Sequence, residues 1–248
     1  MIAHERHQKI LSSLAKRKQV GAAELQSLTG ASAATLRRDL DFLAGKDLLV
    51  RIHGAVLHPS TAAAEPSLLQ KSRSSVEAKR KIAAVAVDMV PTGATVFVDS
   101  GTTCLEVGRM LRVRADLTLV TNSLPMIAGH EQFRAKLIVI GGERRAVSGA
   151  LVGGLANAGM NCIKADIALI GASGLDPESG PGTTELLERD IKALWIKNAR
   201  RTILLCDSGK WASASAIIFA KWDDVDAFVT DRKPPNSFRP TTTKVYIS

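Results

Sequence analysis

Short apolar runs alternate with helix-length segments along most of the chain, and this alternation constrains the fold more than any other feature. Runs rich in Val, Ile and Leu are predicted as strands at 94–98, 117–120, 136–140, 166–170, 202–206 and 226–230. Most of them are separated by segments long enough for a helix, and a helix is predicted before the first of them, at 77–90. Repeated strand–helix units of this kind favour an α/β fold around a mostly parallel sheet.

The first 57 residues have a different pattern, which predicts three helices followed by a two-stranded hairpin. Gly30 is placed to end the second helix and Ser32 to cap the third. In the third helix Leu36, Leu40 and Leu43 recur at i, i+4 and i+7, which predicts one buried stripe.

A small, polar, proline-interrupted segment follows and is typical of a linker. The sequence therefore predicts a first domain at 1–57, a linker at 58–75 and a second domain at 76–248.

Positive charge is concentrated in the first third of the chain. The whole sequence carries 33 Lys and Arg against 24 Asp and Glu, a net charge of +9. Residues 1–57 account for +4 of this excess and residues 58–81 for a further +3. A local basic surface attracts polyanions such as nucleic acid through counterion release. A solvated surface with a basic linker would give the same count, so charge leaves both interpretations open.

Two short predicted helices joined by residues 30–32 have the layout of a helix-turn-helix, whose second helix enters the major groove of DNA. Small residues open that helix, and its free N–H groups can meet a phosphate. An arginine there can bind guanine or a phosphate. The predicted DNA-binding residues are Ser32, Ala33, Thr35, Arg37 and Arg38 on the helix, with Arg51 and His53 on the hairpin. An ordinary three-helix bundle with a surface arginine pair is the alternative.

Polar and glycine residues follow the predicted strands, at the edge where open α/β sheets bind ligands. The first strand runs into Asp99-Ser100-Gly101-Thr102-Thr103, where hydroxyls and free N–H groups at a helix start make an anion site. Other strand ends carry Thr121-Asn122, Gly141-Gly142, Gly171 to Gly174 and Asp207 to Lys210. For Gly141 a simple turn is the alternative, and for Lys210, a candidate partner of a phosphate, the alternative is a surface lysine.

Composition excludes several other classes of protein. No run approaches the roughly 18 apolar residues of a membrane span, and residues 1–10 lack the apolar core of a secretory signal. Cys104, Cys162 and Cys206 are far apart and form no CxxC or Cys/His pattern, so neither a metal site nor a disulfide is expected. We therefore expect a reduced, cytoplasmic protein with no cofactor and no membrane partner.

The N-terminal motifs resemble those of a known family. Thr35-Leu36-Arg37-Arg38-Asp39-Leu40, followed by Leu48-Leu49-x-Arg51-x-His53-Gly54, is similar to the winged helix-turn-helix signature of the DeoR family of bacterial sugar-metabolism repressors. The similarity continues through Glu65-Pro66, Arg73 and Glu77-Ala78-Lys79 and covers nearly the whole chain, although Ala55 replaces a usual glycine. The resemblance implies a regulator, most simply a repressor of a carbohydrate-metabolism operon, that a phosphorylated sugar releases from its operator.

The resemblance also implies a Rossmann-like second domain similar to ribose-5-phosphate isomerase and CoA-transferase folds. In that domain Ser100, Gly101, Thr102, Thr103 and Lys210 would hold the phosphate, Asp99, Thr121, Asn122, Gly171 and Gly174 would line the sugar, and Thr183, Thr184 and Glu188 would close the pocket. Gly209 stands where the family often has a serine. A single DNA-binding module buries little DNA surface, so a homodimer or homotetramer bound to double-stranded operator DNA is expected.

An aldose–ketose isomerase would need a carboxylate base over the sugar carbons. The related isomerases carry an Asp-Gly-Ala-Asp-Glu segment at a strand end, whereas residues 170–175 here offer no carboxylate before Asp176. Walker A, GxGxxG and HExxH motifs do not occur. We therefore expect no catalytic activity. An isomerase or transferase with Asp99 or Glu188 as base, and a scaffold whose basic head binds partner proteins, are the alternatives.

Overall fold

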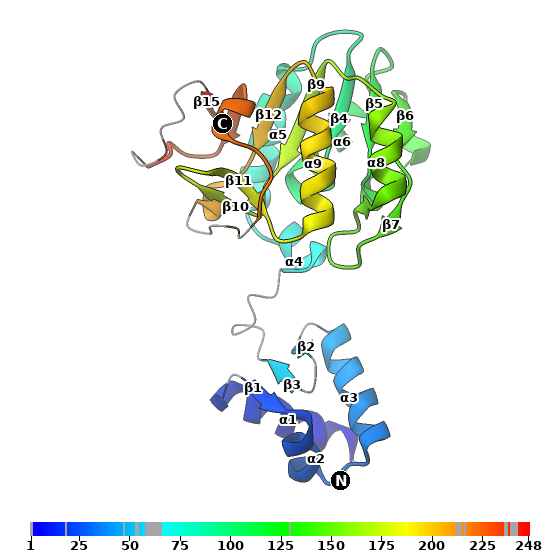
Figure 1. Ribbon diagram of the computed structural model, residues 1–248, viewed down its shortest axis with the longest axis vertical. Helices are drawn as coiled ribbons and strands as arrows, with labels where there is room; N and C mark the ends of the chain where they lie inside the picture. The colour runs from blue at the N-terminus through cyan, green and yellow to red at the C-terminus, as the bar shows by residue number, and fades with distance from the viewer. Residues whose placement is uncertain are drawn as a thin grey trace. The chain divides into compact units, whose positions relative to one another are not determined.

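The computed structural model describes residues 2–17, 19–46, 48–52, 55–57, 66–128, 130–211, 215, 217–235, 238 and 243–248. They form two compact units, unit 1 at Met1–Ser67 and unit 2 at Leu68–Ser248, both drawn in Figure 1.

Unit 1 contains three helices and a small antiparallel sheet. The helices are α1 (Ala3–Arg17), α2 (Ala22–Thr29) and α3 (Ala33–Gly45), and the strands are β1 (Gln19–Gly21), β2 (Val50–Ile52) and β3 (Ala55–Leu57), in the order β1-β3-β2. Ile10, Leu14, Leu25, Leu40 and Leu43 are among the apolar side chains buried between the helices. The predicted three helices and hairpin are confirmed, and β1 is an additional strand.

The turn between α2 and α3 is set by two residues. Gly30 ends α2 with φ of 62°, a left-handed conformation that glycine adopts without strain, and its N–H donates to Gln26 O. Ser32 caps α3 by accepting a hydrogen bond from the Thr35 N–H at 3.3 Å. Both predictions for this turn are confirmed, and together they fix the direction in which α3 leaves α2.

Unit 2 is built on a seven-stranded, fully parallel sheet in the order β15-β14-β12-β9-β4-β5-β6. The strands are β4 (Thr95–Val98), β5 (Thr118–Thr121), β6 (Lys136–Val139), β9 (Ile167–Gly171), β12 (Thr202–Leu205), β14 (Ala227–Thr230) and β15 (Lys244–Ile247). The first six confirm the six predicted strands. The edge strand β15 was not predicted.

Helices cover both faces of this sheet (Figure 1). Helices α5 (Val76–Asp88) and α6 (Thr102–Leu111) lie on one face, and α8 (Gly154–Asn161) and α9 (Leu186–Asn198) lie on the other. Side chains of each strand alternate between the two cores: Val96 and Val98 face α5 and α6, whereas Phe97 packs edge-on against Trp195 of α9, with ring centroids 4.6 Å apart. The α/β prediction with a parallel sheet is confirmed.

Shorter elements complete unit 2. They are α4 (Leu68–Arg73), α7 (Leu124–Ile127), the hairpin β7 (Glu143–Arg144) with β8 (Leu151–Val152), a sheet of β10 (Gly174–Asp176), β11 (Gly180–Thr183) and β13 (Ile217–Ile218), and the 3₁₀ turns η1 (His130–Gln132), η2 (Ser208–Lys210) and η3 (Trp222–Asp224).

The predicted linker at 58–75 is too long. Residues 68–73 form helix α4, and the compact unit 2 begins at Leu68. Hydrogen bonds from other parts of unit 2 hold this helix at both ends. Residues 58–65 of the predicted linker lie outside the described residues.

The strand order reverses at the middle of the sheet. From β4 the chain adds β5 and then β6 on one side, and it returns to place β9 on the other side of β4. In open α/β sheets ligands bind outside the carboxyl ends of the strands at such a reversal. The edge of the sheet where β4 and β9 end is therefore the candidate ligand site of unit 2.

Candidate DNA interface and effector site

Helix α3 presents an exposed basic face. Its buried stripe is Leu36, Asp39, Leu40 and Leu43, as predicted for the three leucines. Arg37 and Arg38 are exposed, and their side chains form no ion pair or hydrogen bond with another residue that the structure describes. Of the other predicted DNA-binding residues on α3, Ser32 and Ala33 are exposed at its start and Thr35 is half-buried beside them. All five therefore lie on one accessible end of a helix, as DNA recognition requires.

The hairpin contributes one described residue to this surface. Arg51 on β2 is exposed and forms an ion pair with Asp41 of α3. The predicted contact residue His53 lies outside the described residues.

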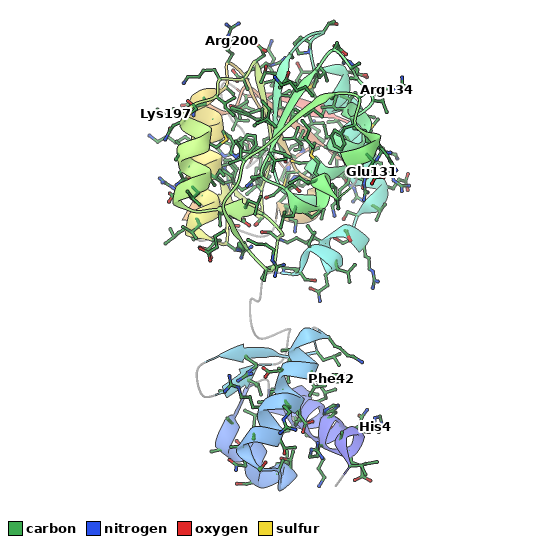
Figure 2. All side chains as sticks on the ribbon, turned by 90° about the vertical axis from the view of Figure 1, so that its right-hand side faces the viewer. His4, Phe42, Glu131, Arg134, Lys197 and Arg200 are labelled. Carbon is green, nitrogen blue, oxygen red and sulfur yellow. The ribbon has the colours of Figure 1, made fainter. Side chains whose placement is uncertain are left out.

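Asp39 ties α3 to α1 from below the exposed face. Arg6 donates to both carboxylate oxygens of Asp39, at 2.7 and 3.1 Å, and His7 Nε2 lies 2.9 Å from Oδ1. His7 also stacks on Phe42, which is half exposed and is labelled in Figure 2, with ring centroids 5.1 Å apart. These contacts fix the rotation of α3 about its axis, and hence the direction of Arg37 and Arg38.

Replacing Asp39 by alanine is expected to destabilise unit 1 by about 2–3 kcal/mol, because Arg6 loses its charged acceptor. The hydrogen bond from Arg6 holds the pKa of Asp39 below its ordinary 3.8, against burial and with help from His7. The folded state thus binds fewer protons than the unfolded state, so this stabilisation exists above roughly pH 4 and is lost as the pH falls.

Hydrogen exchange of the α1 and α3 amides measures this loss separately from unit 2. The matched control is Asp41→Ala, which breaks only an exposed ion pair and is expected to cost under about 1 kcal/mol. Equal protection in the two variants would contradict the anchoring role of Asp39.

At the strand reversal of unit 2, Asp99 and Gly171 are joined directly. The Gly171 N–H donates to Asp99 Oδ2 at 3.0 Å, and Lys192 of α9 donates to the same oxygen and, at 2.9 Å, to Gly171 O. Asp99 and Lys192 are both buried. Burial opposes the charge of Lys192, but Asp99 and Glu188 outweigh it and raise its pKa, so the ammonium persists at neutral pH.

Buried polar atoms without a partner gather at the ends of β4 and β5. Asp99 Oδ1, Asn122 Oδ1 and Ser123 Oγ are enclosed and accept or donate no hydrogen bond within the described part of the chain. Thr121, by contrast, is satisfied: its hydroxyl donates to Val98 O at 2.7 Å. Buried polar groups are nearly always paired, so an unpaired group of this kind indicates a place for a polar ligand or water.

Glu188 lies beside this cluster, with partners from two other segments. Its Oε1 accepts from Arg145 Nη1 and its Oε2 from the Thr183 hydroxyl, both at 3.1 Å. Glu188 is 5% exposed. Hydrogen bonds from an arginine and a hydroxyl hold this carboxylate in a fixed orientation.

A second group of charges gathers around the start of α6. Lys79 of α5 is buried, and burial lowers its pKa. The charge of Asp207 raises the pKa of Lys79, and the charge of Lys210 lowers it further. Lys79 Nζ donates to the carbonyls of Lys71 and, at 2.7 Å, Ser74. Beside Lys79, Thr102 borders a hollow of about 220 Å³ that α4, α5 and α6 enclose. A hollow therefore exists beside the first residue of α6, and its lining carries the cations Lys79, Arg80 and Arg109 together with the carboxylate of Glu106.

The remaining predicted site residues lie at the same sheet edge or beyond it. Ser100 and Gly101 connect β4 to α6, Thr102 and Thr103 are the first residues of α6, and Lys210 ends the turn η2 after β12. Gly141 is exposed and follows the edge strand β6. Gly174 is buried at the start of β10, and Thr184 is exposed between β11 and α9.

Four charged residues that lie around the predicted site residues were not predicted from the sequence: Lys79, Arg145, Lys192 and Asp207. Asp207 and Lys79 belong to segments that the sequence analysis singled out, but neither was predicted as a site residue. Lys192 follows Glu188 by four residues, so the helical repeat places both on one face of α9. Arg145 had no signal, because its partner Glu188 is 43 residues away.

The residues with described positions offer neither a metal site nor a membrane-spanning helix. No three His, Cys, Asp or Glu side chains among them are grouped to hold a metal ion. None of their helices combines the length and apolar character that crossing a bilayer requires.

Unit 1 is a winged helix with an accessible arginine pair, and unit 2 is an α/β unit with unpaired polar groups at its strand reversal. Together they define a ligand-responsive DNA-binding regulator. Residues 6–62 match the model of the DeoR-like helix-turn-helix domain, and residues 74–232 match that of the DeoR C-terminal sensor domain. The chain belongs to the DeoR family of transcriptional regulators.

Relatives of the same length support this assignment. The HTH-type transcriptional regulator FruR of Bacillus subtilis is 32% identical and the alignment covers 93% of this chain and 92% of that one. The glycerol-3-phosphate regulon repressor of Escherichia coli is 30% identical over 98% of this chain and 96% of that one. These comparisons confirm the prediction of a DNA-binding regulator rather than an enzyme.

Among solved structures, ribose 5-phosphate isomerase A of Methanocaldococcus jannaschii is similar to this chain with a TM-score of 0.42 and 18% identity, covering 56% of each chain.

Proposed function

We propose that the protein represses a carbohydrate-metabolism operon and that a phosphorylated sugar, bound where β4 and β9 end, releases it from its operator. The observation that carries this proposal is the set of enclosed, unpaired atoms Asp99 Oδ1, Asn122 Oδ1 and Ser123 Oγ. Two of the three are oxygen atoms of a carboxyl and an amide group, which accept hydrogen bonds, and sugar hydroxyls are donors that would satisfy them. The site thus favours a polyhydroxylated ligand over an apolar one.

A phosphate fits beside this polyol site. The N-terminus of α6 offers the N–H groups and hydroxyls of Thr102 and Thr103, and the charges of Lys79 and Lys210 lie close to each other. In this proposal Ser100, Gly101, Thr102, Thr103 and Lys210 bind the phosphate, Asp99, Thr121, Asn122, Gly171 and Gly174 line the sugar, and Thr184 and Glu188 close the site, with Gly141 at its rim.

The name of one relative agrees with a small phosphorylated polyol: the Escherichia coli protein is a glycerol-3-phosphate regulon repressor. The operator would be bound through Ser32, Ala33, Thr35, Arg37, Arg38, Arg51 and His53. We further propose a homodimer or homotetramer, because one winged helix contacts only about 600–1,000 Å². Such a regulator works in the cytoplasm, with the chromosome.

Replacing Lys210 by alanine is expected to leave operator affinity within about 2-fold and to abolish release by the sugar phosphate, because the phosphate loses its charged donor. Fluorescence anisotropy of operator DNA, selected from random duplexes, measures both quantities as pentose, hexose and glycerol phosphates are titrated. Lys244→Ala, on the exposed face of β15, is the matched control. Wild-type release by the Lys210 variant would refute this phosphate assignment.

A further inference from the structure

Helix α4 is the element at which the chain from unit 1 enters unit 2, since unit 2 begins at Leu68. None of its six residues is buried, and Leu69 is 58% exposed. Hydrogen bonds at its two ends therefore matter more for its position than apolar packing does. Figure 1 shows α4 at the same end of unit 2 as the start of α9.

The first residue of α4 is held by the turn of the β7–β8 hairpin. The Leu68 N–H donates to Val147 O at 2.9 Å. Two backbone hydrogen bonds close this turn, from Arg145 N to Ala150 O at 2.8 Å and from Gly149 N to Arg145 O at 2.9 Å. Gly149 has φ of 67°, and a Cβ there would lie 3.1 Å from Pro125. The turn is thus a tightly packed unit that moves Leu68 if it moves.

The side chain of Arg145 leads from the same turn into the proposed ligand site. Its guanidinium is 16% exposed and lies 3.1 Å from Glu188. Glu188 acts electrostatically on Lys192, and Lys192 is ion-paired with Asp99. Two ion pairs, Asp99–Lys192 and Glu188–Arg145, therefore lie between the strand reversal and the turn that holds α4, and Glu188 and Lys192 interact electrostatically without a direct ion pair.

The last turn of α4 is also held by a residue near the site. Lys79, whose charge lies close to those of Asp207 and Lys210, donates to the carbonyls of Lys71 and Ser74. One end of α4 is therefore held by the hairpin turn that carries Arg145, and the other end is held by Lys79.

We infer that Arg145 is a positioning residue that couples the occupancy of the sugar-phosphate site to α4, and through α4 to the DNA-binding unit. The inference rests on the proposed function. A ligand that draws Glu188 or Lys192 toward its hydroxyls changes the partner of Arg145, and the turn at 145–149 then shifts Leu68. The ligand moves this equilibrium only by its different affinity for the two positions of the turn.

The test compares Arg145→Gln with Arg144→Gln, which removes the same charge from the exposed neighbour on β7. In the ligand-free protein, hydrogen exchange of the Leu68 amide is expected to be about 10-fold faster in Arg145→Gln than in either wild type or control. In the presence of the panel phosphate that most raises the wild-type melting temperature, Arg145→Gln is expected to bind that phosphate within about 3-fold of wild type and to need at least 10-fold more of it for operator release.

The inference is overturned if Leu68 exchanges at the wild-type rate in Arg145→Gln, or if release occurs at the wild-type concentration. If no phosphate of the panel shifts the wild-type melting temperature, the proposed function fails, and the Leu68 exchange rate still decides whether Arg145 holds α4. If Arg145→Gln does not fold, Arg145→Lys takes its place. Lysine keeps the charge of arginine but not its planar guanidinium. Arg145→Lys is therefore expected to bind the phosphate as wild type does and to need more of it for operator release, and release at the wild-type concentration would overturn the inference.

Discussion

Replacing both Arg37 and Arg38 by alanine is expected to weaken operator binding by about 2–6 kcal/mol, which is at least roughly 30-fold. Both side chains are exposed on the accessible end of α3, and neither forms an ion pair or a hydrogen bond within the described ranges. An arginine in this position binds a guanine edge or a phosphate, and no internal ion pair must be broken first. Anisotropy with selected operator DNA and with a scrambled duplex measures the effect.

The matched control removes two positive charges from unit 2. Lys197 and Arg200 are exposed residues of that unit and are labelled in Figure 2, and the side chain of Arg200 is 86% exposed. Lys197→Ala with Arg200→Ala is expected to change affinity by less than about 2-fold, because both residues belong to unit 2 and not to the helix-turn-helix domain. Equal losses in the two double variants would mean that net charge, and not α3, binds the operator.

Replacing Lys192 by methionine is expected to destabilise unit 2 by about 3–5 kcal/mol, because the carboxylate of Asp99 is then buried without its cation. For a unit of this size the loss corresponds to a fall of roughly 6–20 °C in melting temperature. Since the pKa of Lys192 is raised above 10.5 in the folded state, its stabilising contribution is complete at neutral pH and is lost only in strong alkali. Calorimetry of the full chain measures the change.

Two variants show whether the ion pair is the cause. Lys192→Met combined with Asp99→Asn removes both charges and is expected to recover most of the lost stability. Lys197→Met changes a lysine on the exposed surface of the same helix and is expected to have an effect within about 0.5 kcal/mol. A wild-type melting temperature for Lys192→Met alone would contradict the arrangement described for Asp99 and Gly171.

The sequence predicted those parts of the fold whose signals are local. The six central strands are apolar runs with clear ends, and the α2–α3 turn has Gly30 and Ser32 in the positions that helix ends require. Strand β15 was not predicted, because it is an edge strand that is mostly exposed and therefore lacks a buried apolar run. Strand β11, Gly180–Thr183, contradicts strand propensity and forms through pairing with β10 and β13.

In the candidate site, too, the residues with a local sequence signal were predicted and those held by long-range contacts were not. Groups at strand ends, such as Asp99 and Gly171, could be found because every parallel strand ends at one edge of the sheet. Arg145 reaches the site from a distant hairpin, and α4 is held by partners far away in the chain, so only the folded structure brings them together. Long-range contacts of this kind leave no local pattern.

The most direct test of the central claim is operator release measured by anisotropy while pentose, hexose and glycerol phosphates and their unphosphorylated counterparts are titrated into the protein–operator complex. The account predicts that at least one phosphorylated compound releases the DNA and raises the melting temperature of unit 2, whereas its unphosphorylated form does neither at the same concentration. If the unphosphorylated sugar were equally effective, or if no phosphate either released the DNA or shifted the melting temperature, unit 2 would not be the sensor of a sugar phosphate.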